Sequence, residues 1–319
     1  MLTPRSMLLA SIAAGVIMND RTAKAAQPAT PINFDVPAGA CDCHTHIHPD
    51  PAKYPFSSGR VYTPELALPE EMAELHKALR MERVVIVTPS IYGTDNSATL
   101  FGMAARGATA RGVAVIDDKT SESDLDAMGK AGIRGIRLNL ATGGVNDPTV
   151  GRPRFSAAVE RIKARGWHVQ LFTSLAMITA IKDLVLTSPV PVVFDHFGGA
   201  RAALGVDQPG FADLVELVKS GKAHVKISGA YRASKLGPDY ADATPLARQL
   251  ISANPDRIVW GTDWPHPNSV TPAGKQVTDV TPLFQIDDGR LLNQLPVWTA
   301  DAGIRKKILV DNPARLYGF

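Results

Sequence analysis

The sequence predicts an α/β fold of one domain, a (β/α)8 TIM barrel that spans residues 40–319. Eight short, β-branched apolar runs alternate with helical patterns over this range, which is typical of βα units that build a parallel sheet. The runs carry too few polar residues for an antiparallel sheet with one face in water. No glycine-rich phosphate loop follows the first run, as an open doubly wound sheet would need. The barrel is therefore favoured over that alternative.

The strands and helices can be placed in order along the chain. In the first helical stretch, residues 69–83, Met72, Leu75 and Leu79 recur at helical spacing, and charged residues fill most other positions. The predicted strands are residues 40–47, 83–89, 112–117, 135–139, 168–173, 190–195, 224–228 and 257–262. Further predicted helices include residues 154–165, 176–186 and 211–219. Glycines follow three helical stretches, where a left-handed end residue is favoured: Gly132, Gly166 and Gly221.

The composition indicates an ordinary globular protein. The 319 residues are 45% hydrophobic and 20% charged, and the net charge is +3. A chain of this length and composition can bury a sizeable core. Its charge is too small to indicate a nucleic-acid or anionic-membrane partner, and no basic stripe is interleaved with aromatic residues. We expect neither kind of partner.

The first 26 residues differ from the rest and predict a signal peptide. Arg5 precedes an apolar run at residues 7–18, and small residues follow up to Ala25 and Ala26, where we expect cleavage. The run is too short to span a bilayer. The mature protein is thus expected in the periplasm or outside the cell; the alternative is a cytoplasmic chain with a disordered leader. Residues 27–39 predict an extended lead-in to the barrel.

Four polar residues end three of the predicted strands. His44 and His46 end the first strand, and because they lie two apart their side chains point the same way. His196 follows the sixth strand and Asp263 the eighth. Catalytic groups of TIM barrels gather at the carboxyl ends of strands. We therefore expect three imidazoles and one carboxylate to meet at the barrel mouth and to be functional.

The other histidines call for separate interpretations. His168 and His224 begin strands, so they are expected to be structural residues on the opposite face of the barrel. His76 lies within the first helix and is expected at the surface. His48 and His266 lie on loops at the mouth and can be either structural or functional.

The strand-end motifs identify a family resemblance. His44-Thr-His46, His196 and the Gly-Thr-Asp-Trp-Pro-His-Pro run at residues 261–267 resemble the amidohydrolase superfamily. More narrowly, they resemble the branch with 2-pyrone-4,6-dicarboxylate lactonase, 4-sulfomuconolactone hydrolase, and the sugar-acid lactonases and lactone isomerases. The resemblance covers residues 38–319 and includes the C-terminal run at residues 311–319, which we interpret as structural.

The resemblance bears on metal binding. Most members of the superfamily hold one or two divalent metals with further ligands on strands four to six. Here strand four offers Arg137 and Asn139 instead of a bridging lysine or glutamate, and strand five has no histidine at its end. A binuclear site is therefore not expected, and the lactonase branch implies no metal cofactor.

One zinc remains the alternative. It would be held by His44, His46 and Asp263, with or without His196, because three protein ligands and a water form an ordinary catalytic zinc site.

Arginines at strand ends predict capture of an anionic substrate. A planar guanidinium suits two-point binding of a carboxylate. Arg137 on strand four and Arg232 after strand seven match positions where the resembled lactonases bind the substrate carboxylate; the alternative is a structural ion pair. The dicarboxylate lactonase has another arginine where this chain has Gly143, so one anion contact is missing. Further substrate contacts are expected from Ser90, Tyr92, Asn139, Gln170 and His266.

The resemblance implies a hydrolase that opens a small carboxylated lactone. Asp263 would be the general base on water and later return the proton to the leaving ring oxygen. His196, with His44 and His46, would polarise the carbonyl. Three alternatives remain open: a lactone isomerase on the same site, a zinc-dependent decarboxylase of the superfamily, and an exported binding protein without catalytic activity.

Overall fold

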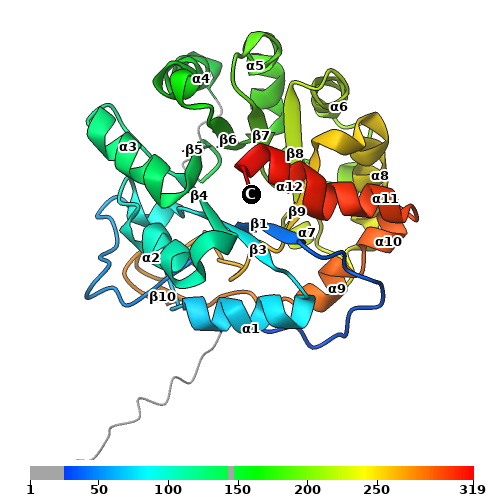
Figure 1. Ribbon diagram of the computed structural model, residues 1–319, viewed down its shortest axis with the longest axis horizontal. Helices are drawn as coiled ribbons and strands as arrows, with labels where there is room; N and C mark the ends of the chain where they lie inside the picture. The colour runs from blue at the N-terminus through cyan, green and yellow to red at the C-terminus, as the bar shows by residue number, and fades with distance from the viewer. Residues whose placement is uncertain (1–24, 143–146) are drawn as a thin grey trace, which may run out of the picture.

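The computed structural model of the protein describes residues 25–142 and 147–319, which form a barrel of parallel strands surrounded by helices (Figure 1). The predicted signal peptide therefore lies outside the described residues except for Ala25 and Ala26, and so does Gly143. None of the described helices has the length and apolar character that crossing a bilayer requires.

The eight predicted strands are all present and lie in sequence order around the barrel. Each pairs in parallel with the next, which confirms the predicted (β/α)8 architecture. Their bounds are β1 Cys41–Thr45, β3 Arg83–Val87, β4 Ala110–Ala114, β5 Ile133–Asn139, β6 His168–Phe172, β7 Val192–Phe194, β8 Ala223–Ser228 and β9 Ile258–Gly261.

The barrel closes between its first and last strands. A parallel bridge joins Thr45 to Trp264, just beyond β9. The Asp263 amide donates to the His44 carbonyl at 2.8 Å, and the His46 amide donates to the Trp264 carbonyl at 2.8 Å. A Cβ atom at Gly261 would lie 2.7 Å from the His44 nitrogen, so only glycine lets β9 approach β1 this closely. The closure thus holds two predicted site residues side by side.

Helices cover the outside of the barrel (Figure 1). The first ends at Leu79, four residues before the predicted end, because Arg80 turns into the left-handed region with φ 59°. The three predicted glycines follow helical segments with φ of 103°, 68° and 78°. The helices are α1 Pro69–Leu79, α2 Ser97–Arg106, α3 Glu122–Ala131, α4 Pro148–Ile162, α5 Leu175–Thr187, α6 Phe211–Lys219, α7 Ala230–Ala233, α8 Thr244–Ala253, α9 Asp288–Leu292, α10 Leu295–Trp298, α11 Ala302–Lys306 and α12 Asn312–Tyr317.

The C-terminal helix α12 crosses the end of the barrel at which the strands begin (Figure 1). Tyr317 is buried there against Cys41, Cys43 and Val85. The Asn312 amide donates to the carbonyl of Ile258 at 2.7 Å. The C-terminal run is therefore structural, as predicted, and it seals the floor of the barrel.

The lead-in before β1, residues 27–39, contains no helix or strand. The Trp264 indole donates to the Ala26 carbonyl at 3.2 Å, and the Thr30 hydroxyl donates to Asp287 at 2.6 Å. Nearby, two short strands, β2 Thr63–Pro64 and β10 Val280–Thr281, pair in parallel. These contacts hold the segments that surround the mouth.

Candidate active site

Asp263 brings the four predicted residues together. Its Oδ1 lies 3.6 Å from His44 Nε2, 3.5 Å from His46 Nε2 and 3.8 Å from His196 Nε2. All four side chains are buried. His44 and His46 come from β1 and its end, His196 follows β7, and Asp263 follows β9. The strands thus converge where the barrel rule expects catalytic groups.

Backbone conformation helps to aim two of these residues. His196 and Asp263 both lie in the left-handed region, with φ of 47° and 66°. Non-glycine residues seldom adopt this conformation, and such strain often occurs at functional sites. Gly229 leaves room beside them, because a Cβ atom there would lie 3.2 Å from Asp263 Oδ2 and from His196 Nδ1.

The two oxygens of Asp263 have different surroundings. Oδ2 accepts a hydrogen bond from the Tyr231 hydroxyl at 2.6 Å and a short one from Arg232 Nε. Oδ1 accepts no well-formed hydrogen bond from the described residues. Burial opposes ionisation, but the nearby Arg232 guanidinium and His196 together hold the pKa of Asp263 well below its usual range. The side chain is an ionised carboxylate with one oxygen free for chemistry.

The three imidazoles are neutral at neutral pH. Burial lowers the pKa of His44 and His46, and lowers that of His196 to about 4. His46 Nδ1 lies 2.7 Å from the Val87 carbonyl, which can only accept, so the proton is on Nδ1 and Nε2 is an acceptor. His196 Nδ1 lies 3.0 Å from the Ser228 hydroxyl, which can donate or accept, and 3.4 Å from the Ser228 carbonyl, which can only accept. The hydroxyl is compatible with either form of His196, and the carbonyl favours the hydrogen on Nδ1.

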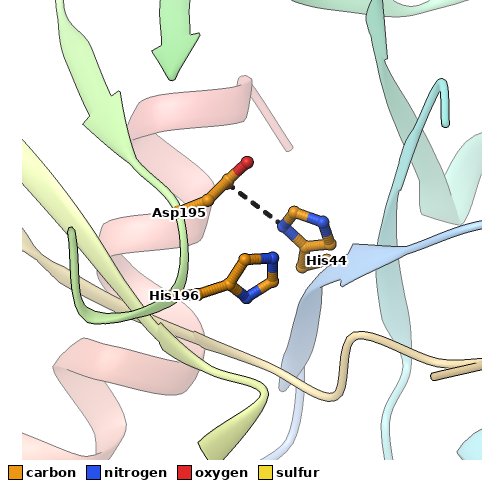
Figure 2. Close-up of side chains that lie close together, drawn as sticks. All are labelled: His44, Asp195 and His196. Atoms are coloured by element: carbon orange, nitrogen blue, oxygen red, sulfur yellow. Dashed lines mark ion pairs between the residues drawn. The ribbon is translucent and has the colours of Figure 1, made fainter. Parts of the chain in front are cut away.

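Three residues that we did not predict support the site from below. Asp195 Oδ1 lies 3.2 Å from His44 Nδ1 (Figure 2). Lys226 on β8 is fully buried and donates to the Cys43 carbonyl at 2.9 Å. Tyr231 holds Asp263, as described above. A sequence signal existed for Lys226, since a lysine two residues before Ser228 on a buried strand points to the same face as the site.

Both predicted arginines form ion pairs with protein carboxylates. Arg137 places Nε and Nη2 each 3.1 Å from Asp195 Oδ2, and Arg232 contacts Asp263. Their guanidinium groups lie over the same Phe172 ring, at 5.3 and 5.9 Å from its centre. The structural ion pair that the sequence left open is thus present in both cases, and both side chains also line the cavity above Asp263.

That cavity has a volume of about 20 Å³, enough for roughly one water molecule. His44 lies beneath it and is not part of its wall. The wall includes His46, Tyr62, Ser90, Arg137, Asn139, Phe172, His196, Arg232 and Asp263. A larger cavity of about 680 Å³ adjoins it and shares Ser90, Arg137 and Asn139 with it.

Three predicted substrate contacts lie away from the small cavity. Tyr92 is buried against Phe56, with ring centres 5.6 Å apart. Gln170 is buried below the site, where its amide donates to Asp195 at 3.1 Å. His266 pairs with Asp288 at 3.1 Å. The structure therefore does not bring these three side chains to the cavity, although Ser90 and Asn139 do reach it.

The prediction that His76 lies at the surface was wrong. It is buried between Asp42 and Arg106, at 3.2 and 2.8 Å. Asp42 also accepts from the backbone amides of His44 and Thr262, at 3.1 and 3.0 Å. The buried His76 therefore supports the carboxylate that ties β1 to the end of β9.

The comparison with protein families agrees with this geometry. The profile described as amidohydrolase (Amidohydro_2) matches residues 41–319. The chain belongs to the amidohydrolase family. This confirms the resemblance seen in the strand-end motifs.

Several curated relatives named for lactones or a pyrone are similar over nearly the whole chain. The 4-sulfomuconolactone hydrolase of Hydrogenophaga intermedia is 36% identical over 90% of this chain and 91% of its own. The 2-pyrone-4,6-dicarboxylate hydrolase of Comamonas testosteroni is 33% identical over 92% and 94%. The D-galactarolactone isomerase of Agrobacterium fabrum is 32% identical over 88% and 91%. A crystal structure of an Agrobacterium tumefaciens protein superposes with a TM-score of 0.76 and 30% identity, over 92% and 98%.

Because many amidohydrolases hold metals, the donor atoms need a test. His44, His46 and Asp263 lie close enough to share one ion, as do His44, Asp195 and His196. The distances of 3.5 and 3.6 Å from the imidazoles to Asp263 are near the roughly 3.4 Å between ligands of a tetrahedral zinc. His44 Nδ1, however, lies 3.3 Å from Lys226 Nζ, a donor, and 3.2 Å from Asp195 Oδ1, an acceptor. The set fits one ion by distance, and it fits by protonation only where the His44 hydrogen lies on Nδ1.

Proposed function

We propose that this enzyme hydrolyses a small lactone that carries a carboxylate. The observation that carries the proposal is the ionised, buried Asp263, whose free Oδ1 faces neutral imidazoles beside a water-sized cavity. An ester carbonyl is a better electrophile than an amide, so a base and hydrogen bonds suit this reaction. Amidohydrolase relatives named as lactone hydrolases support the same substrate class.

Asp263 is the general base in this proposal. Its Oδ1 takes a proton from water as the oxygen attacks the lactone carbonyl carbon. The ring C–O bond then breaks, and the same carboxyl group returns the proton to the leaving ring oxygen. The Tyr231 and Arg232 bonds to Oδ2 hold the carboxylate plane during both transfers. Such base assistance contributes about 10²–10⁴-fold to the rate.

The three imidazoles have different roles in this proposal. His196 lines the cavity and, when the Ser228 hydroxyl donates to its Nδ1, presents an Nε2–H that polarises the carbonyl. His46 also lines the cavity, but its Nε2 is an acceptor and holds the attacking water. His44 lies below the wall, so it acts on Asp263 rather than on the carbonyl. The sequence assigned carbonyl polarisation to all three rings, and the proposal narrows it to His196.

The arginines select an anionic substrate. Arg137 and Arg232 flank the same aromatic ring on the cavity wall, a position from which both can reach an incoming carboxylate. A carboxylate that binds Arg232 also draws positive charge away from Asp263 and makes it a stronger base. The adjoining cavity of about 680 Å³ offers space for the part of the substrate that does not react.

We further propose that catalysis requires no metal. A divalent ion held by His44, His46 and Asp263 would polarise the carbonyl and lower the pKa of a bound water. Arg137 and Lys226 lie beside Asp195, and Arg232 lies beside Asp263, so each carboxylate of the site already has a cation next to it.

We also propose that residues 1–26 direct export. This is tested by sequencing the N-terminus of the protein recovered from the periplasm, where a start near residue 26 is expected.

A panel of small carboxylated lactones tests the proposed reaction. Each is incubated with the enzyme in water enriched in ¹⁸O, and products are followed by NMR and mass spectrometry. Hydrolysis yields a hydroxy acid with one ¹⁸O atom in the new carboxyl group. Lactone isomerisation, the second candidate because of the D-galactarolactone isomerase relative, yields a new lactone without the label. No turnover across the panel would contradict both.

A further inference from the structure

Lys226 is a buried cation for which the proposed reaction has no direct use. It is fully buried on β8, and its ammonium group has three hydrogens to donate. Two go to the Cys43 carbonyl at 2.9 Å and the Gln170 side-chain oxygen at 2.7 Å. The Gln170 orientation is fixed because its NH₂ group donates to Asp195 at 3.1 Å. The third hydrogen points toward His44.

His44 Nδ1 lies between a hydrogen-bond donor and a hydrogen-bond acceptor. Lys226 Nζ, a donor, is 3.3 Å away, and Asp195 Oδ1, an acceptor, is 3.2 Å away (Figure 2). One ring nitrogen cannot accept and donate at once. Lys226 Nζ meets the geometry of a hydrogen bond to this nitrogen, while the Asp195 carboxylate lies slightly nearer and forms an ion pair with the ring. The two groups therefore compete for Nδ1, and a charged Lys226 can only donate to it.

The position of the ring proton depends on the partner of Nδ1. With Nδ1 accepting from Lys226, a neutral imidazole carries its hydrogen on Nε2. That nitrogen is buried, has no hydrogen-bond partner within the described part of the chain, and lies 3.6 Å from Asp263 Oδ1. A hydrogen there faces a carboxylate oxygen, which is favourable. A lone pair there would be the second one to face this oxygen, because His46 Nε2 already does so, and two are unfavourable unless a cation lies between them.

We propose that Lys226 is a positioning residue that fixes His44 as the Nε2–H tautomer. In this form the ring directs an N–H donor at Asp263, and its Nε2 has no lone pair with which to bind a metal. A metal-binding histidine usually donates a hydrogen bond from its other ring nitrogen to a carboxylate or carbonyl, and Asp195 Oδ1 lies within reach of His44 Nδ1 for this role. In the proposal, the hydrogen bond from Lys226 to Nδ1 prevents this arrangement. The kinetic part of the inference rests on the proposed function, but the tautomer and the metal exclusion do not.

The tautomer can be read directly from ¹⁵N NMR of the wild-type enzyme with labelled histidine. The spectrum of the His44→Gln variant assigns the His44 signals. A hydrogen-bearing Nε2 and a bare Nδ1 are expected at neutral pH. A hydrogen-bearing Nδ1 on His44 would overturn the proposal, whether or not any Lys226 variant folds.

Lys226→Met tests the cause. The variant keeps the length of the side chain and removes its donors, so His44 should turn its hydrogen toward Asp195 and present a bare Nε2. We expect it to retain about one zinc per chain after dialysis, and the wild type well below one. Wild-type levels of zinc in a folded Lys226→Met variant, or an unchanged His44 tautomer, would contradict the inference. Lys222→Met, at the exposed start of the same region, is the matched control and should behave as the wild type does.

Kinetics separate positioning from general damage. Loss of a hydrogen bond to a charged group is worth roughly 10–100-fold, and in zinc-free buffer we expect kcat of Lys226→Met to fall by that factor with KM little changed. Lys226→Arg, which keeps the donors, should recover part of the loss. Equal loss in Lys226→Arg and Lys226→Met would argue against the donor role. If no lactone is turned over, the NMR and zinc measurements still decide the inference.

Discussion

The backbone amide of Asp263 donates to the backbone carbonyl of His44, and this 2.8 Å bond joins the last strand of the barrel to the first. It places the free carboxylate oxygen beside an imidazole from the opposite end of the chain. The relative position of His44 and Asp263, the proposed base, is thus set by the closure of the barrel. A site held in this way keeps its geometry without substrate.

Asp263→Asn should remove most of the activity while the barrel remains folded. The amide has the shape of the carboxylate but cannot take a proton, so kcat should fall about 10²–10⁴-fold. It also leaves Arg232 without its charge partner, which lowers the free energy of unfolding. Turnover is measured on the active lactone, with circular dichroism to check folding. Asp239→Asn, an exposed residue, is the control; near-native turnover by Asp263→Asn would show that another group is the base.

Arg137→Lys should weaken binding of carboxylated lactones selectively. Lysine keeps the charge but loses the two-point geometry, so KM should rise about tenfold or more, as expected for one lost charged hydrogen bond. The comparison is with the same lactone ring without its carboxylate, whose KM should change little in the variant. Equal effects on both lactones would show that Arg137 serves only the ion pair with Asp195.

Removal of metals should leave hydrolysis intact. The enzyme is dialysed against a chelator, its metal content is measured, and the lactone assay is repeated with and without added zinc. We expect most of the activity to survive, because in the proposed tautomer His44 presents a hydrogen and not a lone pair to Asp263. Activity that disappears with the metal and returns with one zinc per chain would establish the alternative zinc site instead.

Asp288 should make stability depend on pH. Burial raises its pKa from 3.8 to about 6, so between these values the folded protein binds more protons than the unfolded chain. The protonated, buried Asp288 therefore contributes roughly 3 kcal/mol to the free energy of unfolding. This contribution is fully present below about pH 4 and is lost as the pH rises through 6. Urea unfolding from pH 4 to 7 should show the wild type losing this amount relative to Asp288→Asn. A constant difference between the two proteins would contradict the assignment.

The positions of the main site residues could be predicted because the barrel rule depends only on where strands end. His44, His46, His196 and Asp263 follow β-branched runs, and the carboxyl ends of parallel strands meet at one face. Their convergence therefore needed no knowledge of side-chain packing. The lactone chemistry came from the resemblance, and the relatives support that substrate class.

The partners of these residues could not be predicted in the same way. Lys226 meets His44 only because β8 and β1 lie on either side of β9 in the closed barrel, and strand periodicity alone does not give the register between them. Arg232 lies next to Asp263 through a turn after β8 that no motif indicates. His76 was expected at the surface because it lies within a helix rich in charged residues, yet its ring contacts the buried Asp42.

The lead-in before β1 has a practical consequence for engineering the protein. The family match begins at residue 41, yet the Thr30 hydroxyl donates to Asp287, the residue that caps helix α9. Trimming the chain to the family boundary would remove this donor from the start of α9. A truncated version designed by homology alone would thus lose a contact that lies eleven residues before its first strand.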